Sequence, residues 1–167
     1  MRTTIDLEIV GLGIVFYSPF AVAHIQVGED YLEPHFWRGR DVGEHINACQ
    51  ISAFGTGGPG RYVLELYDGP LDEQALNSAK AKVQLGIEVR DGTLCFRDLY
   101  DFMRWDPDCP ADQMVSVADG FYRISVYTSP PDSGILGDGQ AVWLHFEART
   151  EKPVLAWAAV PDLSGER

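Results

Sequence analysis

Several stretches of this chain alternate apolar and polar residues one by one, and turn residues separate the stretches. Valine, leucine and isoleucine occupy every second position of 83–89, and Asp91-Gly92 follows as a two-residue turn signal. The same period of two recurs in 121–128 and 142–149. Because a period of two places successive side chains on opposite faces of a sheet, the pattern predicts β-strands.

The predicted strands number roughly nine and recur about every 10 residues, the spacing typical of an antiparallel sandwich or barrel. Their ranges are 3–27 (two strands with a break), 47–54, 61–68, 83–89, 93–97, 114–118, 121–128, 142–149 and 154–160. We therefore predict an all-β fold, an antiparallel β-sandwich of roughly eight to nine short strands with at most one or two short helices. A chain of this length is expected to form a single β-sandwich domain over 1–167.

The predicted strands are joined by connections of different kinds. Residues 28–46 are polar and are predicted to form a long irregular connection, and long connections are often functional. Residues 71–79 are predicted to form one or two helical turns, and 98–105 a short helix or an irregular strand. Two strands should turn their apolar faces to the core, and the residues expected there are Tyr122, Ile124, Val126, Leu144 and Phe146.

The composition limits the possible ligands. The chain is 46% hydrophobic, which is enough for a core, and its 25 acidic side chains outnumber 13 basic ones, for a formal net charge of −12. Because no basic cluster offsets this excess, we expect no nucleic-acid ligand and, if there is a partner, a basic protein. No apolar run approaches the ~20 residues of a membrane helix and no apolar signal core opens the chain, so we expect no membrane association and a cytoplasmic location.

The acidic side chains gather in two predicted loops, 98–112 and 129–139, where Arg104 is the one basic residue. The aspartates predicted to bind the partner are Asp98, Asp101, Asp106, Asp108, Asp112, Asp132 and Asp138. Trp143 is a further predicted partner-binding residue, because it alternates onto the polar face of 142–149, with His145 expected to face solvent beside it.

No catalytic constellation is visible. Gly55–Gly60 lacks the lysine and the following helix of a phosphate loop, and the aspartates of 106–112 lack the glycine and glutamate of a calcium loop. His35, Glu44 and His45 share one region, and whether they converge in a metal or acid–base site stays open. We predict no catalytic residue, no metal and no cofactor.

The three cysteines show no CxxC spacing. Cys49 and Cys95 fall in predicted strands, where a free cysteine packs as a small hydrophobe. Cys109 lies among aspartates, and nearby negative charge raises a thiol pKa and lowers its reactivity. The sequence therefore predicts three reduced, structural thiols.

Four segments share a pattern of aromatic-rich strands and Asp-Gly turns. They are IVFYSPFAV (14–22), NACQIS through YVLEL (47–66), KVQL, IEV and DGTL (82–94), and DGFYRI into YT (119–128). Together they resemble the competence protein J family, small inhibitors of a DNA-entry nuclease. The resemblance spans about residues 14–130 and implies an all-β sandwich, no catalysis and stoichiometric binding to a nuclease.

Three functions follow from these observations. The first is a non-catalytic acidic binding protein, an inhibitor or immunity-type partner of a basic protein such as a nuclease, which would imitate the charge of nucleic acid. The second is a small-ligand-binding or structural β domain, which a deep apolar cavity would favour. The third is a hydrolase built on paired carboxylates or on His35, Glu44 and His45.

Overall fold

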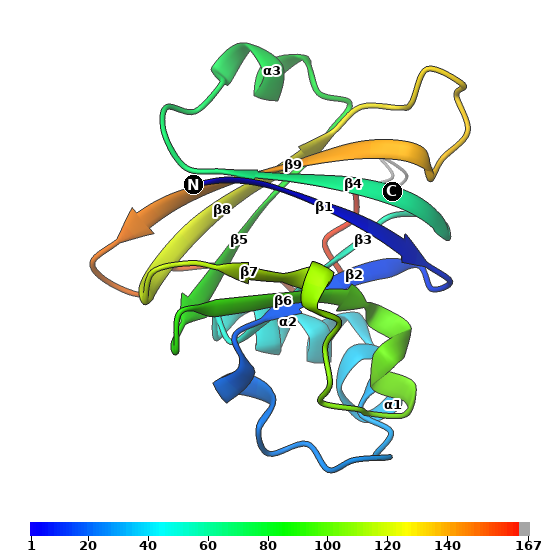
Figure 1. Cartoon of the computed structure of the whole chain (residues 1–167), viewed down its shortest axis with the longest axis vertical. Helices are drawn as coiled ribbons and strands as arrows, with labels where there is room; N and C mark the ends of the chain where they lie inside the picture. Colours follow the sequence, from blue (N-terminus) through cyan, green and yellow to red (C-terminus); the bar gives the residue numbers. More distant parts are fainter. Residues whose placement is uncertain (164–167) are drawn as a thin grey trace.

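In the computed structural model, which describes residues 1–163, two β-sheets pack face to face (Figure 1). The five-stranded sheet, in the order β1-β4-β9-β8-β5, comprises β1 (Arg2–Ile9), β4 (Gly60–Tyr67), β5 (Ala81–Val89), β8 (Gly120–Thr128) and β9 (Asp138–Arg149). The four-stranded sheet, in the order β3-β2-β6-β7, comprises β2 (Gly13–Tyr17), β3 (Ile51–Gly55), β6 (Thr93–Asp98) and β7 (Met114–Ser116). The prediction of a mainly β protein is confirmed.

The five-stranded sheet turns one face of each strand into the core. On β8 and β9 the inward residues Ile124, Val126, Leu144 and Phe146 are each at most 2% exposed. Tyr122, also expected in the core, is half-buried, with its ring edge-on to Phe146. The period of two in the sequence therefore identifies the inward face of these two strands.

The five-stranded sheet is mixed, and the prediction of an antiparallel sandwich is wrong at one pair of strands. β9 lies between β8, to which it is antiparallel, and β4, to which it is parallel. In this parallel pair Glu65 lies beside Trp143, and Tyr67 lies beside His145. Side chains alternate in the same way along parallel and antiparallel strands, so the alternation carries no information about strand direction.

Two connections that reverse the chain are arches that cross from one sheet to the other. The turn Asp91-Gly92 forms as predicted, with φ of 62° and 67°, but it connects β5 of the five-stranded sheet to β6 of the four-stranded sheet. The glycine-rich loop after β3 likewise leads to β4 in the opposite sheet. A turn reverses the chain, but the burial of the whole strand decides whether the two strands pair or stack across the core.

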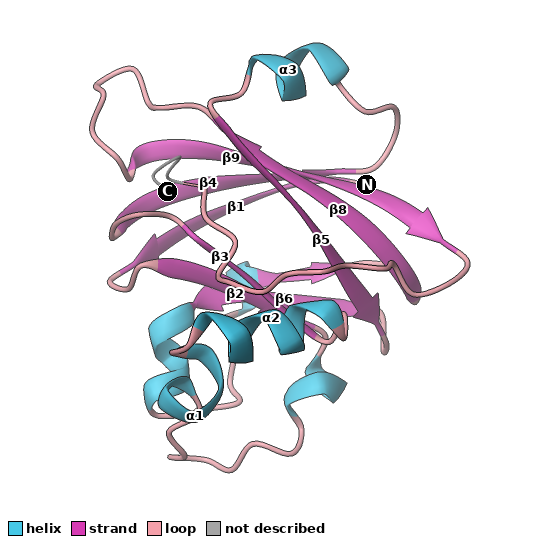
Figure 2. Ribbon diagram, turned by 180° about the vertical axis from the view of Figure 1, so that it is seen from behind, coloured by secondary structure: helices cyan, strands magenta, loops and turns pink. Residues whose placement is uncertain are grey.

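The four-stranded sheet is covered on both faces. All five residues of β2 are buried, and so is β6 from Leu94 to Asp98. One face packs on the five-stranded sheet, and helices α1 (Leu32–Phe36) and α2 (Gly39–Asn47) lie across the other (Figure 2). A strand buried on both faces has a continuous apolar sequence, as IVFY in β2 has, so the sequence contained a sign of this helical layer.

Residues 1–163 contain three α-helices, whereas the sequence predicts at most one or two. The third, α3 (Glu73–Ser78), lies within 71–79 as predicted and is placed outside the five-stranded sheet. Single 3₁₀ turns are η1 (Pro19–Val22), η2 (Leu99–Met103) and η3 (Ala111–Gln113). Within the described part of the chain, no helix is long and apolar enough to cross a membrane.

Helices α1 and α2 replace the irregular connection predicted for 28–46. Their buried residues are spaced by four, Leu32 with Phe36 and Val42 with Ile46, which is the spacing of one helix face. The polar composition of this region was the reason for predicting an irregular connection. Within α2, packing requires Gly43, because a Cβ there would lie 2.5 Å from the carbonyl oxygen of a C-terminal residue.

That C-terminal segment, 154–160, forms no strand, although one is predicted. It runs along α2, where the side-chain amide of Asn47 donates to the carbonyl of Trp157 and accepts from its backbone N–H, both at 2.9 Å. The Trp157 indole donates to the carbonyl of Gln84 at 2.8 Å. These side-chain contacts, rather than a sheet ladder, hold the segment.

Candidate interaction site

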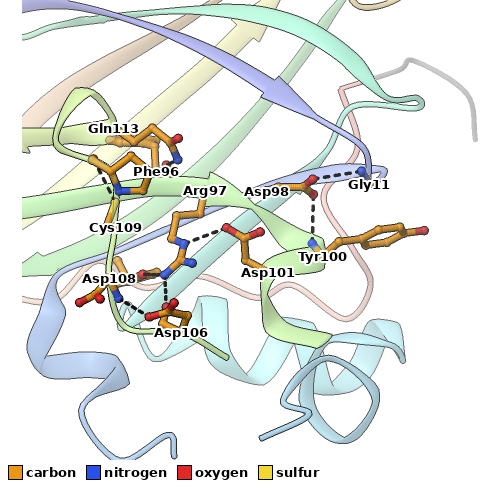
Figure 3. A network of polar contacts seen from close by, with 12 residues as sticks. Gly11, Phe96, Arg97, Asp98, Tyr100, Asp101, Asp106, Asp108, Cys109 and Gln113 are labelled. Atoms are coloured by element: carbon orange, nitrogen blue, oxygen red, sulfur yellow. Dashed lines mark hydrogen bonds and ion pairs between the residues drawn. The ribbon is translucent and has the colours of Figure 1, made fainter. Parts of the chain in front are cut away.

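One buried cation, Arg97, anchors the acidic segment 98–112 (Figure 3). Its Nε donates to Oδ2 of Asp101 at 2.8 Å, and its Nη1 donates to the backbone carbonyl of Asp106 at 2.6 Å. The guanidinium also lies over the ring of Trp105, 4.8 Å from the ring centroid. These contacts fix the path of the segment beside the four-stranded sheet.

The sequence prediction gave Arg97 no role, because only Arg104 was set against the acids. The signal was an arginine at the end of the apolar stretch Leu94–Phe96. A charged side chain in a buried strand needs a partner of opposite charge. Asp101 is that partner, so its charge is largely neutralised within the protein.

Asp98 is buried and has a structural role. Its Oδ2 accepts hydrogen bonds from the backbone N–H groups of Val10 at 2.8 Å and Gly11 at 3.3 Å, and its Oδ1 accepts from Tyr100 at 3.0 Å. A Cβ on Gly11 would lie 2.6 Å from the carboxylate, so this close approach requires glycine. Asp98 therefore ties the β1–β2 turn to the start of η2 and presents no carboxylate to a partner.

Asp106, Asp108 and Asp112 are the exposed members of the predicted set in this segment, and we call them the acidic edge. Oδ1 of Asp106 accepts from the backbone N–H of Asp108 at 3.0 Å. Pro107 and Pro110 restrict the backbone between them. The acidic edge thus projects from a loop whose conformation is held by Arg97, by a local turn and by prolines.

The remaining predicted aspartates lie elsewhere. The loop that carries Asp132 leads from β8 into Asp138 at the start of β9, and it extends beyond the five-stranded sheet (Figure 1). Figure 1 places it on the opposite side of the stacked sheets from the segment of the acidic edge. The structure therefore brings three of the seven aspartates to one exposed edge and separates two from it.

Trp143 lies on the outer face of the five-stranded sheet and lines a pocket of about 370 Å³ near α3. Its ring stacks on Tyr127, 5.5 Å between centroids, and the Tyr127 hydroxyl lies 2.7 Å from that of Tyr67. His145, expected beside it in solvent, is buried, with Nε2 2.8 Å from the carbonyl oxygen of Gly69. The aromatic rings form a second candidate surface.

His35 and His45 converge between α1 and α2, whereas Glu44 is exposed. Nε2 of His45 lies 3.2 Å from Nδ1 of His35, and the Tyr31 ring stacks on His35. Burial lowers the pKa of His45 to about 4, and the neighbouring His35 acts in the same direction. Across residues 1–163, no group of three or more His, Cys, Asp or Glu side chains is placed to hold a metal ion.

All three cysteines are free. Cys49 follows α2 in a left-handed conformation, φ 58°, and not in a strand as predicted, whereas Cys95 lies in β6. The neighbouring Cys95 side chain lowers the pKa of Cys109 and outweighs Asp101 and Asp112, which raise it as expected. Arg97 also lowers this pKa, while burial and Asp101 oppose the shift.

The fold is that of a β-sandwich with one mixed sheet and a helical layer on the smaller sheet. ComJ from Bacillus subtilis, an inhibitor of the DNA degrading activity of NucA, is similar, with a TM-score of 0.50 over 88% of this chain and 96% of ComJ. The protein of crocagin biosynthetic gene J matches with a TM-score of 0.53 over 87% of this chain and 97% of its own. Both are 11% identical in sequence, so the likeness concerns the fold.

These matches confirm, at the level of the fold, the resemblance to the competence protein J family. They extend it from about residues 14–130 to most of the chain. No protein-family model matches the sequence, and no curated protein matches it.

Proposed function

We propose that this protein is a non-catalytic, cytoplasmic inhibitor that binds a basic protein, such as a nuclease, through its acidic edge. The observation that carries the proposal is a fold shared with the nuclease inhibitor ComJ over 88% of the chain, combined with a fixed, exposed set of carboxylates. The same fold on a strongly basic chain would argue for a different partner.

Electrostatics support this mode of binding. The net charge of −12 attracts a basic protein over long range and repels phosphate backbones. Asp106, Asp108 and Asp112 concentrate part of that charge on a loop that Arg97 holds in place, so little ordering is needed when a partner binds. A cleft rich in lysine and arginine, as a nuclease uses for DNA, complements such an edge.

The pocket beside Trp143 supports a second candidate function, the binding of a small ligand. Stacked aromatic rings and adjacent carboxylates line its roughly 370 Å³, which is within the range of small-molecule sites. A hydrolase has less support. His35 and His45 hydrogen-bond to each other, and Glu44, the carboxylate considered with them, is exposed.

The experiment starts by capturing partners from a native lysate on the immobilised protein and identifying them by mass spectrometry. The association rate of the purified partner is then measured by stopped flow between 0.05 and 1 M salt. We expect the rate to fall steeply as the Debye length shortens from ~10 Å at 0.1 M to ~3 Å at 1 M. If the partner is a nuclease, DNA digestion should stop at one inhibitor per enzyme.

A matched pair of double reversals locates the site. Asp108→Lys with Asp112→Lys, and Asp132→Lys with Asp138→Lys, each bring the net charge from −12 to −8. The first pair should slow association roughly tenfold at low salt and the second much less, because only the first alters the acidic edge. Equal effects of the two pairs, or a rate indifferent to salt, would contradict the proposal and direct the search to Trp143.

A further inference from the structure

We infer that Cys95 and Cys109 are a reactive thiol pair that closes to an intramolecular disulfide when the protein meets a low-molecular-weight disulfide. The side chains of the two cysteines interact, and both line one pocket of about 570 Å³ together with Tyr17, Pro107 and Met114. This inference uses thiol chemistry alone and does not depend on the proposed function.

The two cysteines differ in access from solvent. Cys95 is 2% exposed and lies in the middle of the four-stranded sheet, where its backbone pairs with Tyr17 on β2 and with Met114 on β7. Cys109 is half-exposed and lies in a loop between Pro107 and Pro110. A reagent arriving from solvent therefore meets Cys109 first.

The electrostatic surroundings also favour attack by Cys109 before Cys95. A thiol attacks as its thiolate, and the neighbouring Cys95 side chain and the charge of Arg97 both lower the pKa of Cys109. The interaction with Cys109 and burial both raise the pKa of Cys95. Because Cys95 is also shielded from solvent, it reacts after Cys109. Cys109 is thus the attacking thiol and Cys95 the resolving thiol.

The reaction balances as a thiol–disulfide exchange. The Cys109 thiolate attacks one sulfur of a disulfide RSSR, so the S–S bond breaks, a Cys109–SR bond forms and one RS⁻ leaves. Cys95 then loses its proton and attacks Sγ of Cys109, which releases the second RS⁻. The protein is oxidised by two electrons, RSSR is reduced to two RSH, and the two thiol protons end on the released thiols.

Oxidised glutathione is a suitable probe for the folded, full-length protein. After quenching with acid, the intact mass should be lower by two hydrogen atoms. Alkylation should then modify only the remaining thiol, Cys49. Tryptic digestion should join the peptide 91–97 to the peptide 105–123. Glutathione retained on Cys109, a link to the peptide 41–61 that contains Cys49, or an unmodified protein would each overturn the inference.

Single variants assign the two steps. Cys49→Ser should behave like the wild type, because Cys49 is not in the pocket. Cys95→Ser should accumulate glutathione on Cys109, and Cys109→Ser should stay unmodified at the buried Cys95. If Cys95→Ser fails to fold, Cys95→Ala takes its place. If Cys109→Ser instead forms the glutathione adduct on Cys95 at the wild-type rate, the assigned roles are reversed and the inference is overturned.

A comparison with unfolded protein shows whether the fold creates the pair. The measured quantity is the ratio of oxidised to reduced glutathione at which half of the protein is oxidised, with and without guanidinium. Because the fold places both cysteines on one pocket, the folded protein should need an oxidised-to-reduced ratio lower by roughly tenfold or more. Equal ratios would mean that the fold contributes nothing and would contradict the inference.

Discussion

Arg97 donates a hydrogen bond of 2.6 Å from Nη1 to the backbone carbonyl of Asp106, and this bond joins the buried sheet to the exposed acidic edge. A guanidinium presents several donors in a fixed plane, so the same side chain also holds Asp101. The acidic edge therefore depends on a positive charge beneath it.

Replacing Arg97 should loosen this segment. Arg97→Met keeps most of the apolar stem but removes the hydrogen bonds to Asp101 and Asp106, and we expect unfolding in urea to show a loss of ~2–4 kcal/mol. Hydrogen exchange in 105–110 should accelerate. Arg104→Met, at an exposed position, serves as the control and should change stability by less than ~0.5 kcal/mol. Unchanged exchange in Arg97→Met would show that the prolines alone hold the loop.

Phe146 should be one of the main contributors to the core. It is 2% exposed and packs edge-on against Tyr122, so Phe146→Ala should cost ~3–5 kcal/mol in chemical denaturation through lost burial and a remaining cavity. Phe121, on the outer face of β8, is the matched control, and Phe121→Ala should cost clearly less. Similar losses in the two variants would contradict the assignment of the inner face.

His45 should make the protein less stable in mild acid. In the unfolded chain it binds a proton near its ordinary pKa of 6.5, whereas in the folded protein the pKa is about 4. Between these values the unfolded state binds more protons, so the free energy of unfolding falls as the pH falls from 6.5 towards 4.

His45→Gln should remove this part of the pH dependence, which urea midpoints measured from pH 7 to pH 4 will show. If His45→Gln and the wild type lose stability in parallel, the histidine pair is not responsible and titrating carboxylates account for the slope.

Asn47 should hold the C-terminal segment in place. Asn47→Ala removes both hydrogen bonds to the Trp157 backbone, at an expected cost of ~1–3 kcal/mol, and should speed hydrogen exchange in 155–160. Asn77→Ala, on an exposed position of α3, is the control with little expected effect. Normal protection of 155–160 in Asn47→Ala would assign the anchoring to Trp157 packing instead.

The sequence predicted local properties of the fold well. The alternation in 121–128 and 142–149 identified the buried Ile124 and Phe146, and Asp91-Gly92 marked a real turn. The helices of 32–47 were missed because their apolar pairs are few and glycines interrupt them. The strand expected at 154–160 was wrong because an apolar run can pack against a helix as well as in a sheet.

The candidate site was predictable only in part. The exposure of Asp106, Asp108 and Asp112 agrees with their polar, proline-rich surroundings. Asp98 was included with them on charge alone, yet three backbone N–H groups bind it in the interior. A carboxylate that caps a turn and one that faces solvent are the same letter in a sequence, and only their neighbours in space distinguish them.

By itself, the sequence determined that this protein is rich in β-strands, which faces of β8 and β9 are apolar, and that the surface is strongly acidic, because these properties depend on residue type and on near neighbours. The tertiary structure decided which sheet each strand joins, that β9 runs parallel to β4, and that Arg97 meets Asp106. It also placed Cys95 beside Cys109 and His35 beside His45. Such pairings are selected by the burial of the whole chain at once, and no local pattern encodes them.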